Sequence, residues 1–171
     1  MRPAKPGSCW ISSNREAAGF QYGSADGEFA CGSWRVFELR GCIPRCELSC
    51  DVRDLIAVAV AQASGSDYAL SAVCALAQNN GRSESELAAA RVTESEDPRT
   101  AAALRFAAKI VERRGHLSVS EVGALREVGF SDVEVAEIIA SVVLNIYRSY
   151  FNLIARPEID FPVVKTGNSR S

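Results

Sequence analysis

Helix-start signals recur at short intervals along the last two-thirds of this chain. Ser83, Ser118 and Ser131 are each followed three residues later by glutamate, a spacing that forms a capping box, in which each side chain bonds the other residue's backbone N–H. Asp97 before Pro98 is a fourth start, because aspartate caps a helix and proline fits its first turn. Apolar residues follow each signal at helical spacing, so the sequence predicts an all-α fold.

The apolar periodicity predicts about six helices in roughly 110 residues. The first two cover about 52–64 and 67–80, separated by Ser64-Gly65-Ser66. The others follow the four start signals, and the last continues to about residue 155, before Pro157. That last helix is apolar on nearly all sides, which predicts a place in the core or at a subunit interface. No segment has a strand signal of comparable strength.

The sequence changes character near residue 50. Residues 1–50 have no sustained period and are punctuated by Gly, Ser, Pro and Cys. We expect an atypical N-terminal segment at 1–50, a helical domain at 51–164 and a polar tail at 165–171. The first segment could be a divergent cap, a disordered extension or the product of a shifted reading frame, and we favour the last two together.

Five of the six cysteines lie in this first segment, at positions 9, 31, 42, 46 and 50. Zinc sites prefer cysteine pairs two to four residues apart, completed by a second pair or by histidines. The repeat Cys42, Cys46, Cys50 therefore permits a metal without being diagnostic of one. We interpret these cysteines as free thiols in a poorly structured segment, and a metal-binding segment remains the weaker alternative.

The composition is that of an ordinary soluble globular protein, with 47% apolar residues, 23% charged residues and a net charge of -2. Weak acidity gives no electrostatic reason to expect nucleic acid or an anionic membrane as a partner. We find no apolar run near the ~20 residues that span a bilayer, and the basic start leads into no apolar segment. We therefore expect a cytoplasmic protein, with no cofactor or metal.

Several stretches of the helical part carry a resemblance. Residues 53–62 (RDLIAVAVAQ) are similar to the helix before a known active site, and residues 66–73 (SDYALSAV) fall where that site has C-x-Y-C-x-x-x-H. Residues 128–134 (VGFSDVE) and 159–162 (IDFP) continue the match in order and spacing. From about residue 51 to 164 the chain resembles the carboxymuconolactone decarboxylase and alkylhydroperoxidase AhpD-like family. The resemblance implies a compact AhpD-like helical domain that forms homo-oligomers.

The family's peroxidases are oxidoreductases with antioxidant activity, which reduce organic hydroperoxides and take electrons from a dithiol. A helix N-terminus lowers the pKa of a thiol, and C-x-x-C spacing allows attack on a peroxide to resolve as a disulfide. The resemblance places the two cysteines at Ser66 and Ala69, the histidine at Val73 and the upstream acid at Asp54. A second histidine often found in the last helix is matched by Leu153.

Only Asp54 among these five positions keeps the relevant chemistry. A serine hydroxyl does not ionise near neutral pH and does not cycle through sulfenic acid, so we interpret Ser66 as a helix N-cap. Ala69 and Val73 are interpreted as packing residues. The family's decarboxylases also use the histidine, so Val73 leaves that activity no better supported.

Cys74 is the only thiol near these positions. One residue along a helix rotates a side chain by ~100°, so Cys74 should point away from the place of the histidine. We interpret it as a buried, inert thiol, with a relocated nucleophile as the alternative. His116, the only histidine, lies in a basic loop that ends a helix and needs no catalytic role.

Two functional hypotheses follow. The chain is related to thiol-dependent hydroperoxide reductases and severely impaired in that activity, or it is a non-catalytic protein that binds a small molecule or forms an oligomeric scaffold. Turnover of an organic hydroperoxide with a dithiol donor distinguishes them.

Overall fold

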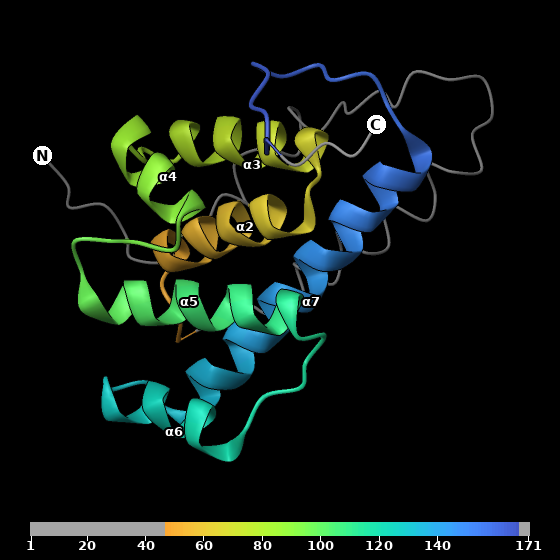
Figure 1. Cartoon of the computed structure of the whole chain (residues 1–171). Coiled ribbons are helices and arrows are strands. Elements are labelled where there is room, and N and C mark those ends of the chain that lie inside the picture. Colours follow the sequence, from red (N-terminus) through yellow and green to blue (C-terminus); the bar gives the residue numbers. More distant parts are fainter. Residues whose placement is uncertain (1–46, 168–171) are drawn as a thin grey trace, which may run out of the picture. The chain divides into compact units, whose positions relative to one another are not determined.

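The computed structural model of the chain describes residues 47–167. This part is helical and contains no strand. Its helices are α2 (Cys50–Ser64), α3 (Asp67–Asn79), α4 (Glu84–Arg91), α5 (Pro98–Glu112), α6 (Val119–Glu127) and α7 (Asp132–Ala155), shown in Figure 1. The predicted all-α class is confirmed, and each expected helix is present.

The helix starts follow the local signals in the sequence. All three predicted capping boxes are formed, at Ser83, Ser118 and Ser131. Asp97 accepts hydrogen bonds from the first-turn amides of α5, and Pro98 is the first residue of that helix. α2 begins two residues before the expected position, because the Ser49 hydroxyl accepts the Val52 N–H and starts the helix there.

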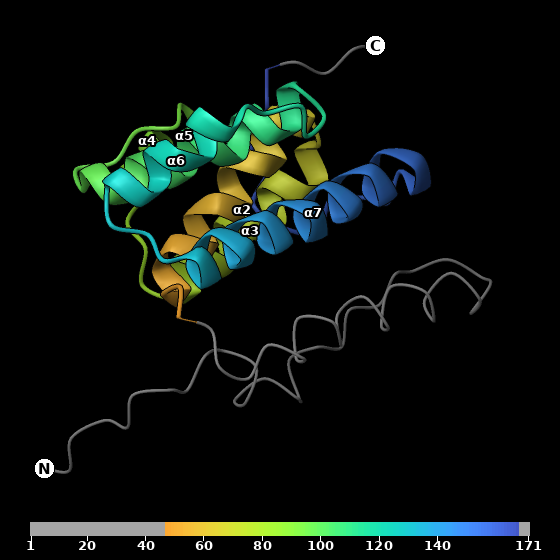
Figure 2. The same cartoon turned by 90° about the horizontal axis from the view of Figure 1, so that it is seen from below.

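The core is built around α2. Seven consecutive residues of this helix, Leu55 to Ala61, are buried, so α2 is covered on every side along two turns. Helices α3, α4, α5 and α7 all pack against it, and α6 contacts α5 and α7. Figure 1 shows α2 between α3 and α5, and Figure 2 shows α7 alongside α2 and α3.

The packed region extends beyond the boundaries expected from the sequence. Leu48 is 1% exposed and belongs to the core, and its N–H donates to Glu137 of α7 at 2.7 Å. At the other end, Thr166 is 6% exposed. The helical domain therefore includes residues before 51, and the expected polar tail begins with residues that pack on the helices.

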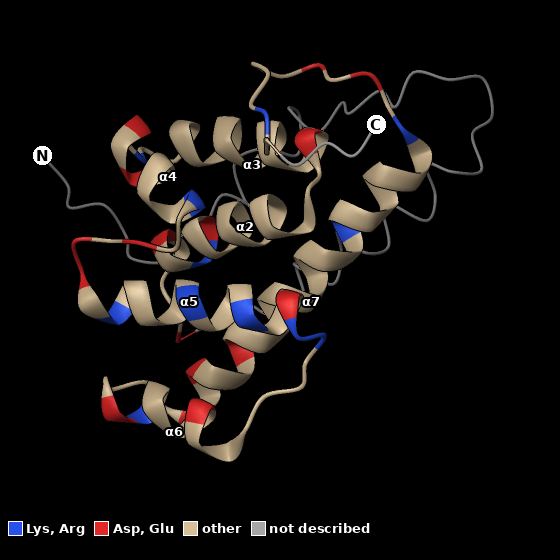
Figure 3. Cartoon of the chain, viewed as in Figure 1, with Lys and Arg blue, Asp and Glu red and all other residues tan. Residues whose placement is uncertain are grey.

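α7 has a polar inner face and an apolar outer face in its C-terminal half. Asn145, Ser149 and Asn152 are buried against the protein. The exposed residues between Ile138 and the helix end are all apolar or aromatic: Ile139, Ala140, Val143, Tyr147, Tyr150, Leu153, Ile154 and Ala155. We call this set the outer face of α7. In Figure 3 most charged residues of α7 lie in its first turns.

α7 also corrects the expectation that no run is apolar and long enough to span a bilayer. By length and composition alone, Asp132–Ala155 qualifies, because an 18-residue window within it has a mean hydropathy of 1.4. The cause is that three of its four charged residues lie in the first two turns, at Asp132, Glu134 and Glu137, so that Arg148 is the only charge from Ile138 to Ala155. The core helix of a soluble protein passes the same test, and α7 packs on α2, α3 and α5.

Candidate functional site

The two-helix unit α2–α3 carries the positions that the resemblance assigns to the site. Gly65 adopts a left-handed conformation at φ +70° and reverses the chain between the helices. Ser66 then caps α3, with its Oγ accepting the Ala69 N–H at 3.3 Å. Ser66 is 1% exposed, so this hydroxyl is a buried helix cap, as the sequence predicts.

Ala69 and Val73 are buried and belong to the hydrophobic core. Their spacing from Ser66 places all three on one side of α3. This side therefore holds one hydroxyl and two alkyl groups in place of two thiols and an imidazole. None of the three ionises near neutral pH, so these positions hold neither a thiolate nor an imidazole.

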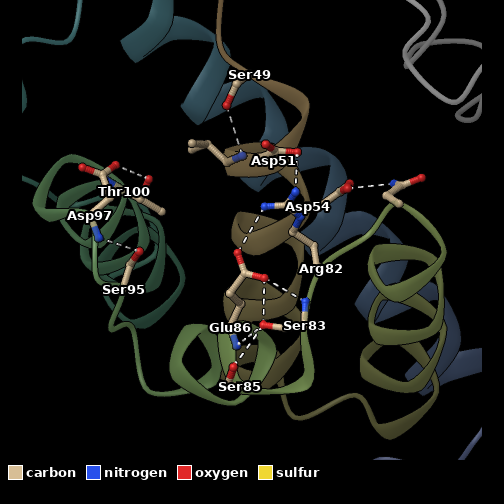
Figure 4. A network of polar contacts seen from close by, with 12 residues as sticks. Ser49, Asp51, Asp54, Arg82, Ser83, Ser85, Glu86, Ser95, Asp97 and Thr100 are labelled. Carbon is tan, nitrogen blue, oxygen red and sulfur yellow. Dashed lines mark hydrogen bonds and ion pairs between the residues drawn. The ribbon is translucent and has the colours of Figure 1, made fainter.

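Asp54 lies toward the other end of α3. Its carboxylate accepts a hydrogen bond from Asn80 Nδ2 at 2.7 Å, and Figure 4 shows Asp54 on α2 with this bond dashed. Asn80 is the C-cap of α3, about 20 Å along the helix from the N-cap Ser66. Val73 stands midway between these ends, and its alkyl side chain offers no group that could carry a proton.

Cys74 is 5% exposed in α3. Burial raises the pKa of this thiol, and the positive charge of Arg91 opposes the rise only in part. A protonated, buried thiol is a weak nucleophile, which agrees with the inert-thiol interpretation. Cys74 shares a side of α3 with Asp67 and Ser71, at helical spacings of seven and three residues, and not with Val73.

The C-terminal segment covers α3 near its start, a feature that sequence reasoning missed. The Tyr68 hydroxyl donates to Asp160 Oδ1 at 3.1 Å, and the Tyr68 and Phe161 rings meet edge to face at 5.9 Å between centroids. Further along, the Ser71 Oγ accepts the Val164 N–H at 2.9 Å. The only local signal was a pair of polar residues, Asp67 and Ser71, four apart in the apolar first part of the helix.

The remaining polar clusters are structural. Arg82 bridges Asp51 and Glu86 at 3.2 Å each, which ties the start of α2 to α4 (Figure 4). His116 is exposed in the loop after α5. The Arg82 contacts join helices at the surface, and a 2.6 Å ion pair of Arg99 with the buried Glu134 joins α5 to α7.

The cysteine-rich segment lies almost wholly outside the described residues. Only Cys50 of the Cys42, Cys46, Cys50 repeat is described, as a half-buried cysteine in the first turn of α2. Arg53 Nη2 contacts its sulfur at 3.0 Å. Within residues 47–167 no group of three His, Cys, Asp or Glu side chains could hold a metal ion.

Comparisons with known proteins agree with the helical fold. A model of the carboxymuconolactone decarboxylase family matches residues 39–113, the stretch that contains α2 to α5. The structure is similar to that of an uncharacterized peroxidase-related protein from Silicibacter sp. TM1040, at 18% identity and a TM-score of 0.60. That match covers 80% of this chain and 68% of the other. At this identity the likeness establishes a shared fold. No functionally curated protein matches the chain significantly.

Proposed function

We propose that this protein is a carboxymuconolactone decarboxylase family member related to thiol-dependent hydroperoxide reductases, and that its own peroxide reduction is severely impaired. One observation carries the proposal. The capped start of α3, where the family's peroxidases place their thiols, is kept as a buried N-cap at Ser66, while Ala69 and Val73 fill the other two positions with alkyl groups.

Peroxide reduction needs a thiolate that attacks the O–O bond, releases an alcohol and becomes a sulfenic acid. A second thiol then displaces water to form a disulfide, which an external dithiol reduces. Ser66 supplies neither step, because its hydroxyl stays protonated and donates no electrons. Cys74 could begin the sequence, but burial keeps its thiol protonated and shields it from substrate. The proposal needs no cofactor.

The test is reduction of cumene hydroperoxide by the purified full chain with excess dithiothreitol. We expect a rate equal to that of dithiothreitol alone. A second protein carries Ser66→Cys, Ala69→Cys and Val73→His together, and we expect it to exceed the background rate, because these changes restore thiols at a helix N-terminus with an imidazole one turn on.

Cys74→Ser and Cys50→Ser are the matched controls, since they remove the buried and the half-buried described thiol in turn. A clear rate in the unaltered chain that disappears in Cys74→Ser would contradict the proposal and identify a relocated nucleophile. A rate that survives both changes would place the activity elsewhere in the chain and also contradict it.

The second candidate function is a non-catalytic, oligomeric binding protein, and the outer face of α7 favours it. This face carries two tyrosines and no exposed charge from Ile139 to the helix end. Tyrosines and aliphatic residues grouped without charge are typical of the buried centre of protein interfaces. We propose a second copy of this chain as the partner, because a lipid-spanning α7 would have to bring its buried Asn145, Ser149 and Asn152 into hydrocarbon.

Sedimentation velocity over a range of protein concentrations tests this assembly. Val143→Glu places a charge on the outer face of α7, where Val143 is 56% exposed, and we expect it to shift the protein to monomer. Val119→Glu is the control, because Val119 is 86% exposed on α6 and is not part of that face. A monomeric unaltered chain at all concentrations would refute a homo-oligomer, and binding to lipid vesicles instead would identify a membrane surface as the partner.

A further inference from the structure

We propose that residues 163–167 form a strap that closes one side of α3, with Asp67 as its latch. The strap is the segment that follows Pro162, and the side it covers carries Asp67, Ser71 and Cys74. The inference does not depend on whether the protein reduces peroxides. It rests on hydrogen bonds from three helices that converge on three consecutive residues of the strap.

α3 holds the strap by two side chains. The Ser71 Oγ accepts the Val164 N–H at 2.9 Å. Asp67 Oδ1 accepts from both the backbone N–H and the hydroxyl of Thr166, at 2.8 and 2.9 Å. Asp67 Oδ2 lies 3.1 Å from the Lys165 ammonium. One carboxylate therefore engages two successive strap residues with three charge-assisted contacts.

α2 and α4 hold the strap from the other direction. Gln62 Nε2 of α2 donates to the Thr166 carbonyl at 2.8 Å. Arg91 Nη2 of α4 donates to the Lys165 carbonyl at 2.7 Å, and its Nε donates to Gln62 Oε1 at 2.8 Å. The two strap carbonyls are thus bound by side chains that also bond each other, so the strap is held on both edges.

Asp67 is the latch because its removal would leave more hydrogen-bond donors of the strap without an acceptor than the removal of any other side chain. Thr166 is 6% exposed, so without the carboxylate its N–H and hydroxyl would lie buried with no acceptor. Hydrogen bonding from the Thr166 backbone N–H lowers the pKa of Asp67, which keeps the carboxylate ionised at neutral pH. The other strap contacts are hydrogen bonds between neutral groups, made by Ser71 and Gln62, or the hydrogen bond of Arg91 to a carbonyl.

The strap governs access to Cys74. Cys74 lies three residues beyond Ser71 on the side of α3 that the strap covers, and Arg91 both binds the strap and acts electrostatically on the thiol. Any reagent that reaches the sulfur from this side must first displace the strap. The rate of Cys74 alkylation in the folded protein therefore measures how often the strap opens.

The experiment measures iodoacetamide labelling of the native full chain, with the Cys74 peptide quantified by mass spectrometry over time. Asp67→Ala removes the latch from α3, and Thr166→Val removes only the strap hydroxyl. We expect Cys74 labelling to be at least ~10-fold faster in Asp67→Ala, with a smaller acceleration in Thr166→Val. Cys50 in the same samples serves as an internal reference, and its labelling rate should not change.

Asp132→Ala is the matched control, because Asp132 is also the first residue of a helix behind a serine N-cap, in α7. Its Cys74 labelling should stay within ~2-fold of the unaltered chain. Equal Cys74 rates in all proteins would overturn the proposal. So would an acceleration that equals the change in the global unfolding constant measured in urea, because the strap would then not open as a separate unit.

Discussion

Replacing Ser66 by alanine tests whether this residue is a helix cap rather than a remnant of a catalytic site. The change removes the hydroxyl that accepts the Ala69 N–H at 3.3 Å. Loss of an N-cap serine typically costs about 1 kcal/mol, within a range of about 0.5 to 2 kcal/mol. Ser66 is almost fully buried, so water cannot easily replace the lost acceptor, and we expect about 2 kcal/mol.

The assay is urea unfolding followed by circular dichroism, together with thermal denaturation. For a domain of this size, a loss of about 2 kcal/mol lowers Tm by roughly 4 to 8 °C. Ser118→Ala is the matched control, since the Ser118 hydroxyl accepts the Glu121 N–H at the same 3.3 Å but is exposed. Water can bind the freed Glu121 amide, so we expect a loss of only about 0.5 to 1 kcal/mol there.

The ranking of these two variants decides the question. A Ser66→Ala protein as stable as the unaltered chain would refute the reasoning, because a buried cap with an unsatisfied amide cannot be neutral. A larger loss in Ser118→Ala than in Ser66→Ala would show that burial does not set the magnitude.

Three further changes test other parts of the fold. Leu104→Ala removes a side chain with no exposed surface in α5 and should lower the free energy of unfolding, measured in urea, by about 2 to 5 kcal/mol. A loss below this range would mean that the surrounding side chains collapse into the cavity. Gly65→Ala should cost about 1 kcal/mol in the same assay, because φ is +70° while no atom would crowd the new Cβ, and an unchanged midpoint would contradict a rigid turn. The Ser118 backbone N–H, with help from nearby cations, lowers the pKa of Glu121 from 4.5 to about 2. The stabilisation by ionised Glu121 is then complete above pH 4.5 and is lost as the pH falls toward 2. The difference in urea midpoint between the unaltered chain and Glu121→Gln should therefore vanish in that pH window. A difference that persists at pH 2 would refute this assignment.

The helix boundaries could be predicted from the sequence because their causes are local. A serine and a glutamate three residues apart meet in the first turn of a helix whatever surrounds them, and all three such pairs do so here. The loss of the family's site residues could also be predicted from the sequence, because Ser66, Ala69 and Val73 stand where the resemblance places two thiols and an imidazole.

The strap could not be predicted in this way. Most of its bonds join side chains on α2, α3 and α4 to backbone groups about 74 to 104 residues later in the chain. Backbone groups carry no residue-specific signal, so nothing in the sequence of residues 163–167 indicates which side chains bind them. Only tertiary packing brings the two parts together.

The orientation of α7 was also beyond the sequence. A helix that is apolar on nearly all sides has no preferred inner face, so its period cannot indicate which residues point inward. The structure buries Asn145, Ser149 and Asn152 and leaves Tyr147 and Ile154 exposed. Contacts with α2 and α3, rather than the hydrophobic pattern of α7 itself, fix that choice.

The strap is also among the last parts of the domain to be synthesised, so it is added after the helices that it covers. Gln62 and its partner Thr166 are 104 residues apart, so at roughly 5 to 20 residues per second a ribosome needs about 5 to 20 s to add the second after the first. Once α3 has been completed at Asn79, α2 and α3 can form their hairpin for the rest of that interval, but the side of α3 that bears Cys74 has no cover. A nascent chain, or one cut short near its end, therefore presents to oxidants and chaperones a thiol that the finished protein conceals.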